Sequence, residues 1–479
     1  MKQLYRFSAI ALSLLTLSFA SCNDYLDRDD DDNITEADVF ARYEKVNGLV
    51  SDVYAKAKKA DRPLVFFEHF SNSAITDECE GTNVEGNITN NFNNGAWNPN
   101  SLPGSCGQYW ESLYEGIRKA NLIIENVAKY NTPDNPQQDG DLRNRIGEMY
   151  FMRGYFHMLL LRMYGEAPYI DYVVHAGDNM DFKKESVHTM VEKIVADAQT
   201  AYGMVPNKYV KTSENFGRVD KGACLGLISF VRWIVATPLW NGASQYGYNL
   251  RRVFENEYTY DINRWRRAKE AAKAVLDFEV GGTKRYSLYM KHDANDFKDP
   301  ADGNLNDSRV YARLWDMFYD MDAFANEYVF FMTKSKDQAW QGDIYPPSRE
   351  GSSRQQPVQE QVDEYEYIVG DYGYPVYSAE ARKGGYDDAN PYVKGTRDPR
   401  FYRDIIYHGA PYRNNKNESK TLNTASGSDK IGATNATTTG YYLRKFQQES
   451  WNKSGNFSIN APAIWRLPEF IYIYAEACN

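Results

Sequence analysis

The thiol of Cys22 stands where a secreted protein could be acylated. Lys2 and Arg6 precede an apolar run at residues 7–20, which is shorter than the roughly 20 apolar residues needed to cross a bilayer. Such a run indicates a signal peptide covering residues 1–21. The four residues that end at Cys22 (Phe-Ala-Ser-Cys) are similar to a bacterial lipobox, with Phe19 where Leu is usual. We therefore expect Cys22 to carry the lipid of a membrane anchor; the alternative is an ordinary secretory signal with a cysteine there by chance.

Aromatic side chains are the second source of possible chemistry. The chain contains 38 Tyr and 9 Trp among 479 residues, which is many for a soluble protein. Tyr and Trp combine a flat apolar face with a polar edge, which suits the C–H faces of sugar rings and also suits protein interfaces. Packing between helices must account for most of these residues, so their position in the chain decides which ones are candidates for binding.

Two long non-helical regions, residues 61–107 and 281–462, hold the candidates. Connections of this length inside a compact protein are usually functional or disordered, and the aromatic content of these two argues against disorder. The positions at which an aromatic ring, an amide or a carboxylate could contact a ligand are Asp77, Trp97, Asn98, Trp315, Trp340 and Tyr345.

Each candidate also has a structural alternative. Trp97 could anchor its loop in the core, and Asp77 could cap a helix or brace a loop. Trp315 lies in an apolar pattern that could be a buried helix. Trp340 and Tyr345 lie among Gln, Gly, Asp and Pro, a loop composition, so we expect them to be exposed.

Charge and motifs argue against several classes of function. Removing residues 1–21 takes away two of the 55 basic residues and leaves 53 against 65 acidic ones, a net charge of −12. This balance argues against a nucleic acid partner. No GxSxG, HExxH, P-loop or GxGxxG motif occurs, and six scattered His without closely spaced Cys indicate no metal or other cofactor. We therefore expect no enzyme, although sequence alone does not test for the two carboxylates that a glycosidase needs.

The elements that must hold these residues are mostly helical. Apolar residues recur at helical spacing in segments that begin near residues 35, 108, 141, 186, 219, 264 and 464. Paired helices of roughly 15–23 residues resemble tetratricopeptide repeats, here interrupted by the two long regions. An acidic tether at residues 22–34 precedes them. Cys79 and Cys106 could pair in an oxidising compartment, but their spacing does not establish it.

Several stretches, spread over nearly the whole chain, resemble the SusD/RagB family of outer-membrane nutrient-binding lipoproteins. The matching stretches are residues 22–27 (CNDYLD), 76–78 (TDE), 151–156 (FMRGYF), 162–168 (RMYGEAP), 238–242 (PLWNG), 397–401 (RDPRF) and 466–470 (RLPEF). Their order and spread make the combination far more specific than any one of them.

The resemblance implies one domain at residues 35–479, with an N-terminal SusD-like part at about 22–240 and a C-terminal SusD/RagB part at about 260–479. It implies a mostly α fold, in which tetratricopeptide-like helix pairs form a superhelix and support an irregular, loop-rich half with short strands. Family members normally continue past the helix that starts near residue 464. We therefore expect the sequence to be truncated and the apolar face of that helix to be uncovered.

For function, the resemblance implies a lipoprotein on the outer membrane, facing the cell exterior, that captures oligosaccharides without catalysis. It also implies delivery of the ligand to a SusC-like TonB-dependent transporter. A peptide-binding protein of the RagB branch is an alternative with the same fold. A surface hydrolase, or a helical scaffold without a small ligand, would belong to another class. Which glycan or peptide binds does not follow from these residues.

Overall fold

A computed structural model gives the structure of most of the chain. The residues that it describes are 35–60, 72–81, 88–98, 104–131, 136–209, 214–243, 254–290, 317–318, 320–332, 342–393, 395–413, 419–446 and 463–479. The signal peptide, Cys22, the acidic tether, Trp315 and Trp340 therefore lie outside the described residues.

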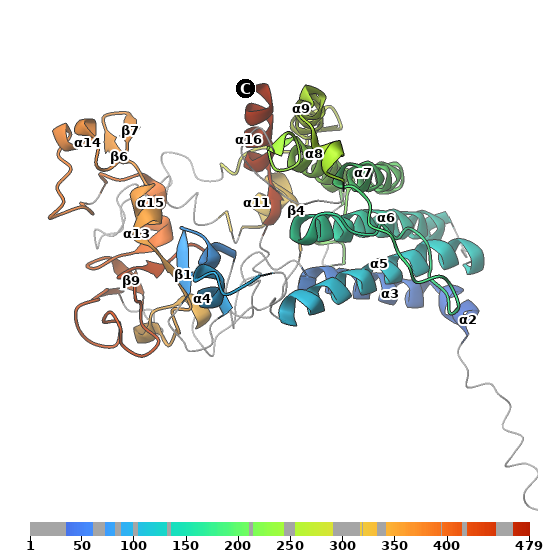
Figure 1. Ribbon diagram of the computed structural model, residues 1–479, viewed down its shortest axis with the longest axis horizontal. Coiled ribbons are helices and arrows are strands. Elements are labelled where there is room, and N and C mark those ends of the chain that lie inside the picture. Colours follow the sequence, from blue (N-terminus) through green and yellow to red (C-terminus); the bar gives the residue numbers. More distant parts are fainter. Residues whose placement is uncertain are drawn as a thin grey trace, which may run out of the picture.

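Long helices form one half of the molecule, which we call the helical half (Figure 1). Its helices are α2 (Glu36–Phe40), α3 (Tyr43–Ala60), α5 (Gly104–Tyr130), α6 (Pro136–Tyr164), α7 (Val187–Met204), α8 (Lys221–Ala236), α9 (Ile262–Leu276) and α16 (Leu467–Cys478). Helix α6 packs against α5 and α7, α8 packs against α7 and α9, and α16 packs against α9 and α8. The predicted mostly α fold is confirmed.

Local signals fix the ends of several of these helices. Thr35 and Asp38 form a capping box at the start of α2, in which the Asp38 N–H donates to Thr35 Oγ1 (3.2 Å) and the Thr35 N–H donates to Asp38 Oδ2 (2.9 Å). Helix α6 ends at Gly165, whose φ of +71° lies in the left-handed region. A Cβ at this position would lie 2.9 Å from the Trp240 ring, so both the backbone conformation and the packing require Gly.

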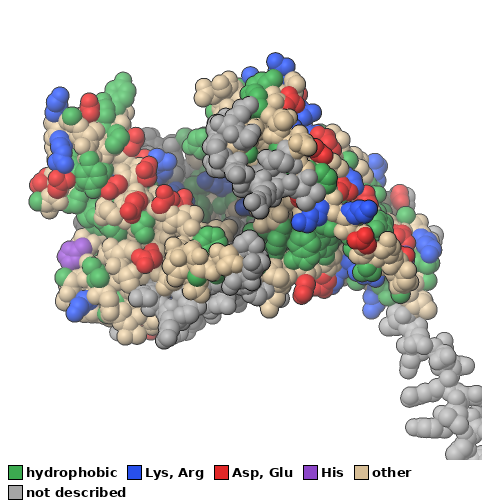
Figure 2. All heavy atoms as spheres, viewed as in Figure 1, with side chains coloured by type: hydrophobic (Ala, Val, Ile, Leu, Met, Phe, Trp, Pro, Cys, Tyr) green, Lys and Arg blue, Asp and Glu red, His purple; other side chains and the backbone are tan. Residues whose placement is uncertain are grey.

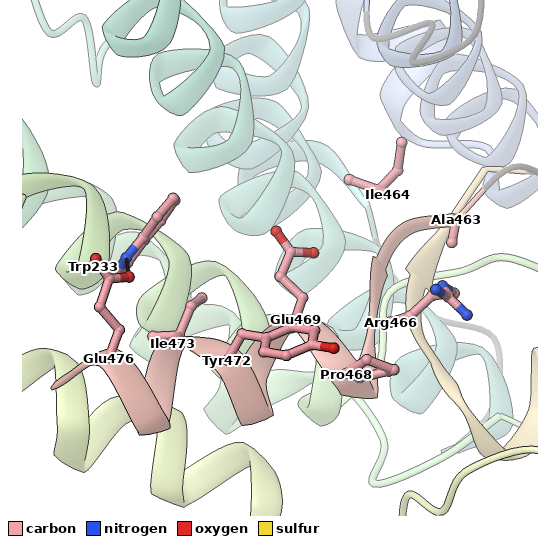
Figure 3. Close-up of a pocket in the computed structure, with 9 residues that line it drawn as sticks. All are labelled: Trp233, Ala463, Ile464, Arg466, Pro468, Glu469, Tyr472, Ile473 and Glu476. Carbon is pink, nitrogen blue, oxygen red and sulfur yellow. Dashed lines mark hydrogen bonds between the residues drawn. The ribbon is translucent and has the colours of Figure 1, made fainter. Parts of the chain in front are cut away.

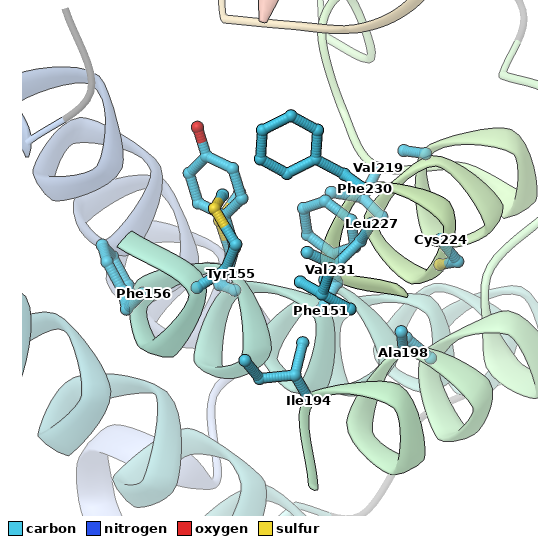
Figure 4. Close-up of a cluster of buried hydrophobic side chains, with 14 of the residues drawn as sticks. Phe151, Tyr155, Phe156, Ile194, Ala198, Val219, Cys224, Leu227, Phe230 and Val231 are labelled. Carbon is cyan, nitrogen blue, oxygen red and sulfur yellow. The ribbon is translucent and has the colours of Figure 1, made fainter. Parts of the chain in front are cut away.

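The core of the helical half is built around α6. Residues 151–161 of this helix are all buried, so this segment is enclosed on every side rather than along one stripe. Figure 4 shows Phe151 and Tyr155 of α6 projecting to the side of Leu227 of α8, with Ile194 of α7 on the opposite side of α6. All four side chains belong to one large apolar cluster that extends through every long helix. This continuous core makes the helical half a rigid support for the other half.

The other half, which we call the loop-rich half, consists of short elements. Its antiparallel pairs are β1 (Cys79–Gly81) with β5 (Gln355–Pro357), β6 (Tyr367–Val369) with β7 (Tyr372–Tyr374), β8 (Ile405–Ile406) with β11 (Tyr442–Leu443), and β9 (Pro411–Arg413) with β10 (Ser419–Thr421). Its short helices are η1 (Asn72–Ile75), α4 (Ile88–Asn93), η4 (Pro347–Arg349), α13 (Gln359–Asp363), α14 (Ala379–Lys383) and α15 (Pro399–Asp404). Several small apolar clusters, rather than one core, hold these elements.

Another strand pair joins the two halves. Strand β12 (Ala463–Arg466), directly before α16, pairs with β4 (Tyr328–Phe331), which follows the short helix α11 (Met321–Asn326). Trp465 of β12 is 2% exposed, and its ring lies 5.9 Å from Tyr155 and 5.6 Å from both Phe230 and Phe330. The remaining short elements, η3 (Glu255–Tyr258) and the hairpin of β2 (Glu279–Val280) and β3 (Thr283–Lys284), flank α9 in the sequence.

The four thiols in the part of the chain that the structure describes are not linked to one another. Cys79 and Cys106, whose pairing the sequence left open, are both free and buried. Burial raises the pKa of the Cys79 thiol to about 12, which keeps it protonated and unreactive. Within the described ranges, no helix combines the length and the apolar character that crossing a bilayer requires.

Candidate functional site

The pairing of β1 with β5 brings the two long non-helical regions together. Cys79 lies opposite Pro357, Glu80 opposite Gln356, and Gly81 opposite Gln355. The turn at residues 76–78 leads into β1, and helix α4 packs against both β1 and η1. Asp77, Trp97 and Asn98 from the first region are therefore carried on the same part of the loop-rich half as the segment that leads from Tyr345 to β5. We call this part the candidate site.

Trp97 forms the aromatic surface of the candidate site. Its side chain is half-exposed, and its ring meets that of Phe92 edge to face at 4.6 Å between centroids. Phe92 itself is 41% exposed. The Asn93 side-chain amide donates to the Ala74 carbonyl oxygen (3.1 Å) and so ties α4 to η1. Two neighbouring rings that both reach solvent are suited to stacking on an apolar ligand face.

Polar side chains flank this aromatic pair. Asp77 and Asn98 are both exposed. Asp77 lies in a turn that Thr76 stabilises, because the Thr76 hydroxyl donates to the Ser73 carbonyl oxygen (2.9 Å) and accepts from the Glu78 N–H (3.3 Å). No helix begins at this turn, so Asp77 is not a helix cap. Its carboxylate makes no hydrogen bond with any residue in the part of the chain that the structure describes.

The expectation that Tyr345 is exposed is wrong. The Tyr345 side chain is 0% exposed, and the Arg349 guanidinium, itself 2% exposed, lies 4.1 Å from its ring centroid. The loop after Tyr345 folds back on it, since the Ser353 N–H donates to the Tyr345 carbonyl oxygen (3.2 Å). A Cβ at Gly351 would lie 2.0 Å from that same oxygen, which shows how closely the loop is packed. The loop composition correctly indicated a turn, but the turn covers the ring, so Tyr345 offers no face to a ligand in this structure. Trp315 and Trp340 lie outside the described residues.

A hydrogen-bonded wall beside β1 was not anticipated from the sequence. Gln356 is buried, and its Oε1 accepts from the Thr438 N–H (2.6 Å) and from the Thr437 hydroxyl (3.0 Å). The Thr438 hydroxyl is also 3.5 Å from the Glu80 carboxylate. Glu80 and Thr438, which are more than 350 positions apart, thus come into contact at this wall. The Thr-rich stretch around Thr438 has no local pattern that would predict this contact.

A separate hollow of about 450 Å³ lies in the helical half (Figure 3). It is lined by Trp233 of α8, by residues of β12, and by one face of α16 that includes Glu469, Tyr472 and Glu476. The Trp233 Nε1–H donates to Glu476 (2.7 Å), so this polar pair is already satisfied. Burial raises the pKa of Glu469 to about 7, against the opposing effect of Arg162 and Arg466. None of the candidate ligand-binding residues that the structure describes (Asp77, Trp97, Asn98 and Tyr345) lines this hollow.

Comparison with family models identifies the class of protein. A model described as "Starch-binding associating with outer membrane" matches residues 24–231, and a model described as "SusD family" matches residues 315–479. Together they cover more than half of the chain, so the chain belongs to the SusD/RagB family. The members of this family are binding proteins.

Individual relatives are more distant. A "SusD-like protein P2" from Formosa agariphila is 29% identical over 129 residues, which span 27% of this chain and 24% of that protein. A SusD-like protein from Bacteroides fragilis matches 93% of this chain and 77% of its own with a TM-score of 0.68 and 19% identity. A laminarin-binding SusD-like protein matches 91% of this chain and 80% of its own with a TM-score of 0.54 and 17% identity. At such identities the solved structures support the fold alone.

Proposed function

We propose that this protein captures oligosaccharides at the candidate site and delivers them to a SusC-like TonB-dependent transporter. The observation that carries the proposal is the half-exposed ring of Trp97 beside the exposed ring of Phe92, with the Asp77 carboxylate and Asn98 amide nearby in the chain. Aromatic faces bind the C–H faces of sugar rings, while carboxylates and amides bind hydroxyl groups. Membership of a family of binding proteins, and the laminarin-binding relative, support the choice of ligand class.

Location and partner belong to the same proposal. Acylation at Cys22 would tether the protein to the outer membrane through the acidic segment at residues 22–34, on the side that faces the cell exterior. A tethered binding protein gains from a fixed partner, because tethering raises the effective concentration of the ligand at the transporter. No catalytic step is part of this proposal.

The first test is binding of the purified protein to a panel of polysaccharides by affinity gel electrophoresis and calorimetry. Trp97→Ala is expected to weaken binding of the captured glycan about tenfold, which corresponds to ~1.4 kcal/mol for loss of a stacking ring. Tyr372→Ala is the matched control, because Tyr372 is 70% exposed but lies on β7, at the end of the loop-rich half away from α4 (Figure 1).

The outcomes test two points separately: whether the protein captures glycans, and whether Trp97 forms part of the binding site. Binding that is lost in Trp97→Ala and kept in Tyr372→Ala supports both. Binding of equal strength in both variants leaves capture standing and moves the site away from Trp97. If the protein binds peptides and no glycan, the peptide-binding alternative replaces this proposal. Turnover of a bound glycan would instead indicate a hydrolase.

A further inference from the structure

Three basic side chains gather around two aromatic rings where the halves meet. The guanidinium carbons of Arg403 and Arg466 lie 5.6 and 5.9 Å from the centroid of the Phe318 ring. The Phe318 ring meets the Phe446 ring edge to face at 4.4 Å, and the Lys445 ammonium lies 5.2 Å from the Phe446 centroid. We call Arg403, Lys445 and Arg466 the basic cluster. Figure 2 shows Lys and Arg side chains deep in the hollow between the helical and loop-rich halves.

Two members of the basic cluster are neutralised within the protein. Arg403 forms a two-point ion pair with Asp404, whose second contact measures 2.5 Å, and Arg466 pairs with Glu327 at 2.7 Å. Both acceptor side chains are buried, at 4% and 3% exposed. Asp404 also accepts from the Tyr365 hydroxyl (2.9 Å), so its oxygens are occupied.

Lys445 differs from the other two. Its side chain is half-buried, and its ammonium forms no ion pair or hydrogen bond with any residue in the described part of the chain. Burial lowers the pKa of Lys445, and the like charges of Arg403 and Arg466 add to this effect, whereas Asp404 and Glu78 oppose it. A half-buried ammonium without an ion pair costs free energy, and an incoming anion would offset that cost.

The backbone holds Lys445 in this place. The Arg444 and Lys445 N–H groups both donate to the Asp404 carbonyl oxygen, at 2.7 and 3.2 Å. The next residue, Phe446, has a φ of +66°, a left-handed conformation that is unfavourable for a bulky side chain. Lys445 follows the end of β11 by two residues, and β11 packs against β5, the strand that pairs with β1 of the candidate site. Lys445 therefore borders the candidate site.

We propose that Lys445 binds an anionic substituent, a carboxylate or a sulfate ester, on the glycan captured at the candidate site. This inference rests on the proposed function and narrows its ligand class from glycans in general to acidic glycans. A hydroxyl group cannot neutralise the Lys445 ammonium, whereas one negative charge can, because the other two members of the basic cluster already have carboxylate partners. Partial burial strengthens that attraction, because the effective dielectric constant is lower than in water.

The test compares glycans that differ only in charge. Calorimetry would measure binding of polygalacturonate against the same polymer after carboxyl reduction, and of a sulfated galactan against its desulfated form. The intact protein is expected to bind at least one charged form about tenfold more tightly than its neutral partner, and added salt should reduce the difference. The pair that shows the difference identifies the substituent.

Variants then assign the effect to Lys445. Lys445→Gln should remove the preference for the charged form without changing affinity for the neutral one, and Lys445→Arg should keep it. Lys383→Gln, at an exposed lysine of α14, should leave the preference unchanged. Because the Lys445 ammonium has no ion pair to lose among the described residues, the unfolding temperature of Lys445→Gln should equal or exceed that of the unaltered protein.

Each result decides the proposal. Equal affinity for charged and neutral forms, or a preference that survives in Lys445→Gln, would overturn the inference and leave glycan capture standing. A lower unfolding temperature in Lys445→Gln with unchanged binding would make Lys445 a structural residue, which also overturns it. Absence of binding to any glycan would overturn the proposed function together with this inference.

Discussion

Arg153→Leu is expected to lower the free energy of unfolding by about 3–5 kcal/mol, because it leaves the buried carboxylate of Asp197 without its positively charged partner. Arg153 of α6 donates to both oxygens of Asp197 on α7, at 2.8 and 2.5 Å, and to the Asn121 side chain on α5 at 3.0 Å. Arg153 and Asp197 are 7% and 5% exposed, so water cannot replace the lost partner. Urea-induced unfolding followed by circular dichroism would measure the change.

An exposed ion pair provides the matched control. Arg382 and Asp388 lie 3.1 Å apart with side chains 50% and 59% exposed. Arg382→Leu should change the free energy of unfolding by less than about 1 kcal/mol, because water and salt already screen this pair. If Arg153→Leu and Arg382→Leu lowered the free energy of unfolding by similar amounts, the contacts of Arg153 with α5 and α7 would not be what stabilises the superhelix.

A second large effect is expected on acidification, through His157 of α6. This imidazole is 0% exposed, and its Nδ1–H donates to the Arg153 carbonyl oxygen (2.8 Å) while its Nε2 accepts from the Ile170 N–H (3.1 Å). A second proton would have to sit on Nε2, against the Ile170 N–H. Burial, which is the largest cause, therefore lowers the pKa of His157 from 6.5 to about 3.

The direction of the pH effect follows from this lowered pKa. Between about pH 6.5 and pH 3 the unfolded state takes up a proton at this imidazole and the folded state does not. The stability that His157 contributes is complete above about pH 6.5 and declines as the pH falls, by up to about 1.4 kcal/mol per pH unit and at most ~5 kcal/mol in all. His188, whose burial lowers its pKa to about 4, acts in the same direction.

Comparison of variants isolates this contribution. His157→Gln keeps an acceptor for the Ile170 N–H but does not titrate, so its unfolding free energy should fall less steeply than that of the unaltered protein between pH 7 and pH 4. His175→Gln, at an exposed position, should follow the unaltered protein. Parallel pH profiles for all three proteins would contradict the assignment to His157.

The carboxyl group of Glu469 changes stability with pH in the direction opposite to His157. Measurements of stability against pH must therefore separate the two contributions. Because burial raises its pKa to about 7, the folded state holds a proton that the unfolded state has already lost above about pH 4.5. Stability from this carboxyl group therefore declines as the pH rises from about 4.5 to 7. The difference between the unaltered protein and His157→Gln cancels this contribution, since both retain Glu469.

The two halves tolerate changes of sequence to different degrees. Stretches such as residues 151–156 and 466–470 contribute to the core and to the junction formed by Trp465, where a change of volume is felt at once. The turn at residues 76–78 and the Trp97 segment lie on the surface of the loop-rich half, where ligand preference can change without loss of the fold.

The sequence by itself determined the class of fold, because the patterns that predict a helix lie within a few neighbouring residues. Apolar periodicity and the Gly165 stop depend on residues a few positions apart, and the periodic segments matched helices of the structure. Of the stretches that resemble the SusD/RagB family, residues 151–156 lie in α6 and residues 467–470 lie in α16. The sequence also nominated Trp97 and Asp77, whose types alone suggest ligand chemistry.

Only the tertiary structure decided which of those residues share a surface. The pairing of β1 with β5 joins positions nearly 280 apart in the chain, and it places Asp77 and Trp97 with the segment that leads from Tyr345. The same packing buries Tyr345 beneath Arg349, although its neighbours have a loop composition. A lone lysine such as Lys445 carries no signal in the sequence. Only the fold places its ammonium near Arg403 and Arg466 without an ion pair among the described residues. The burial of a side chain and the charge around it depend on residues that are distant in the sequence, so no local sequence pattern predicts them.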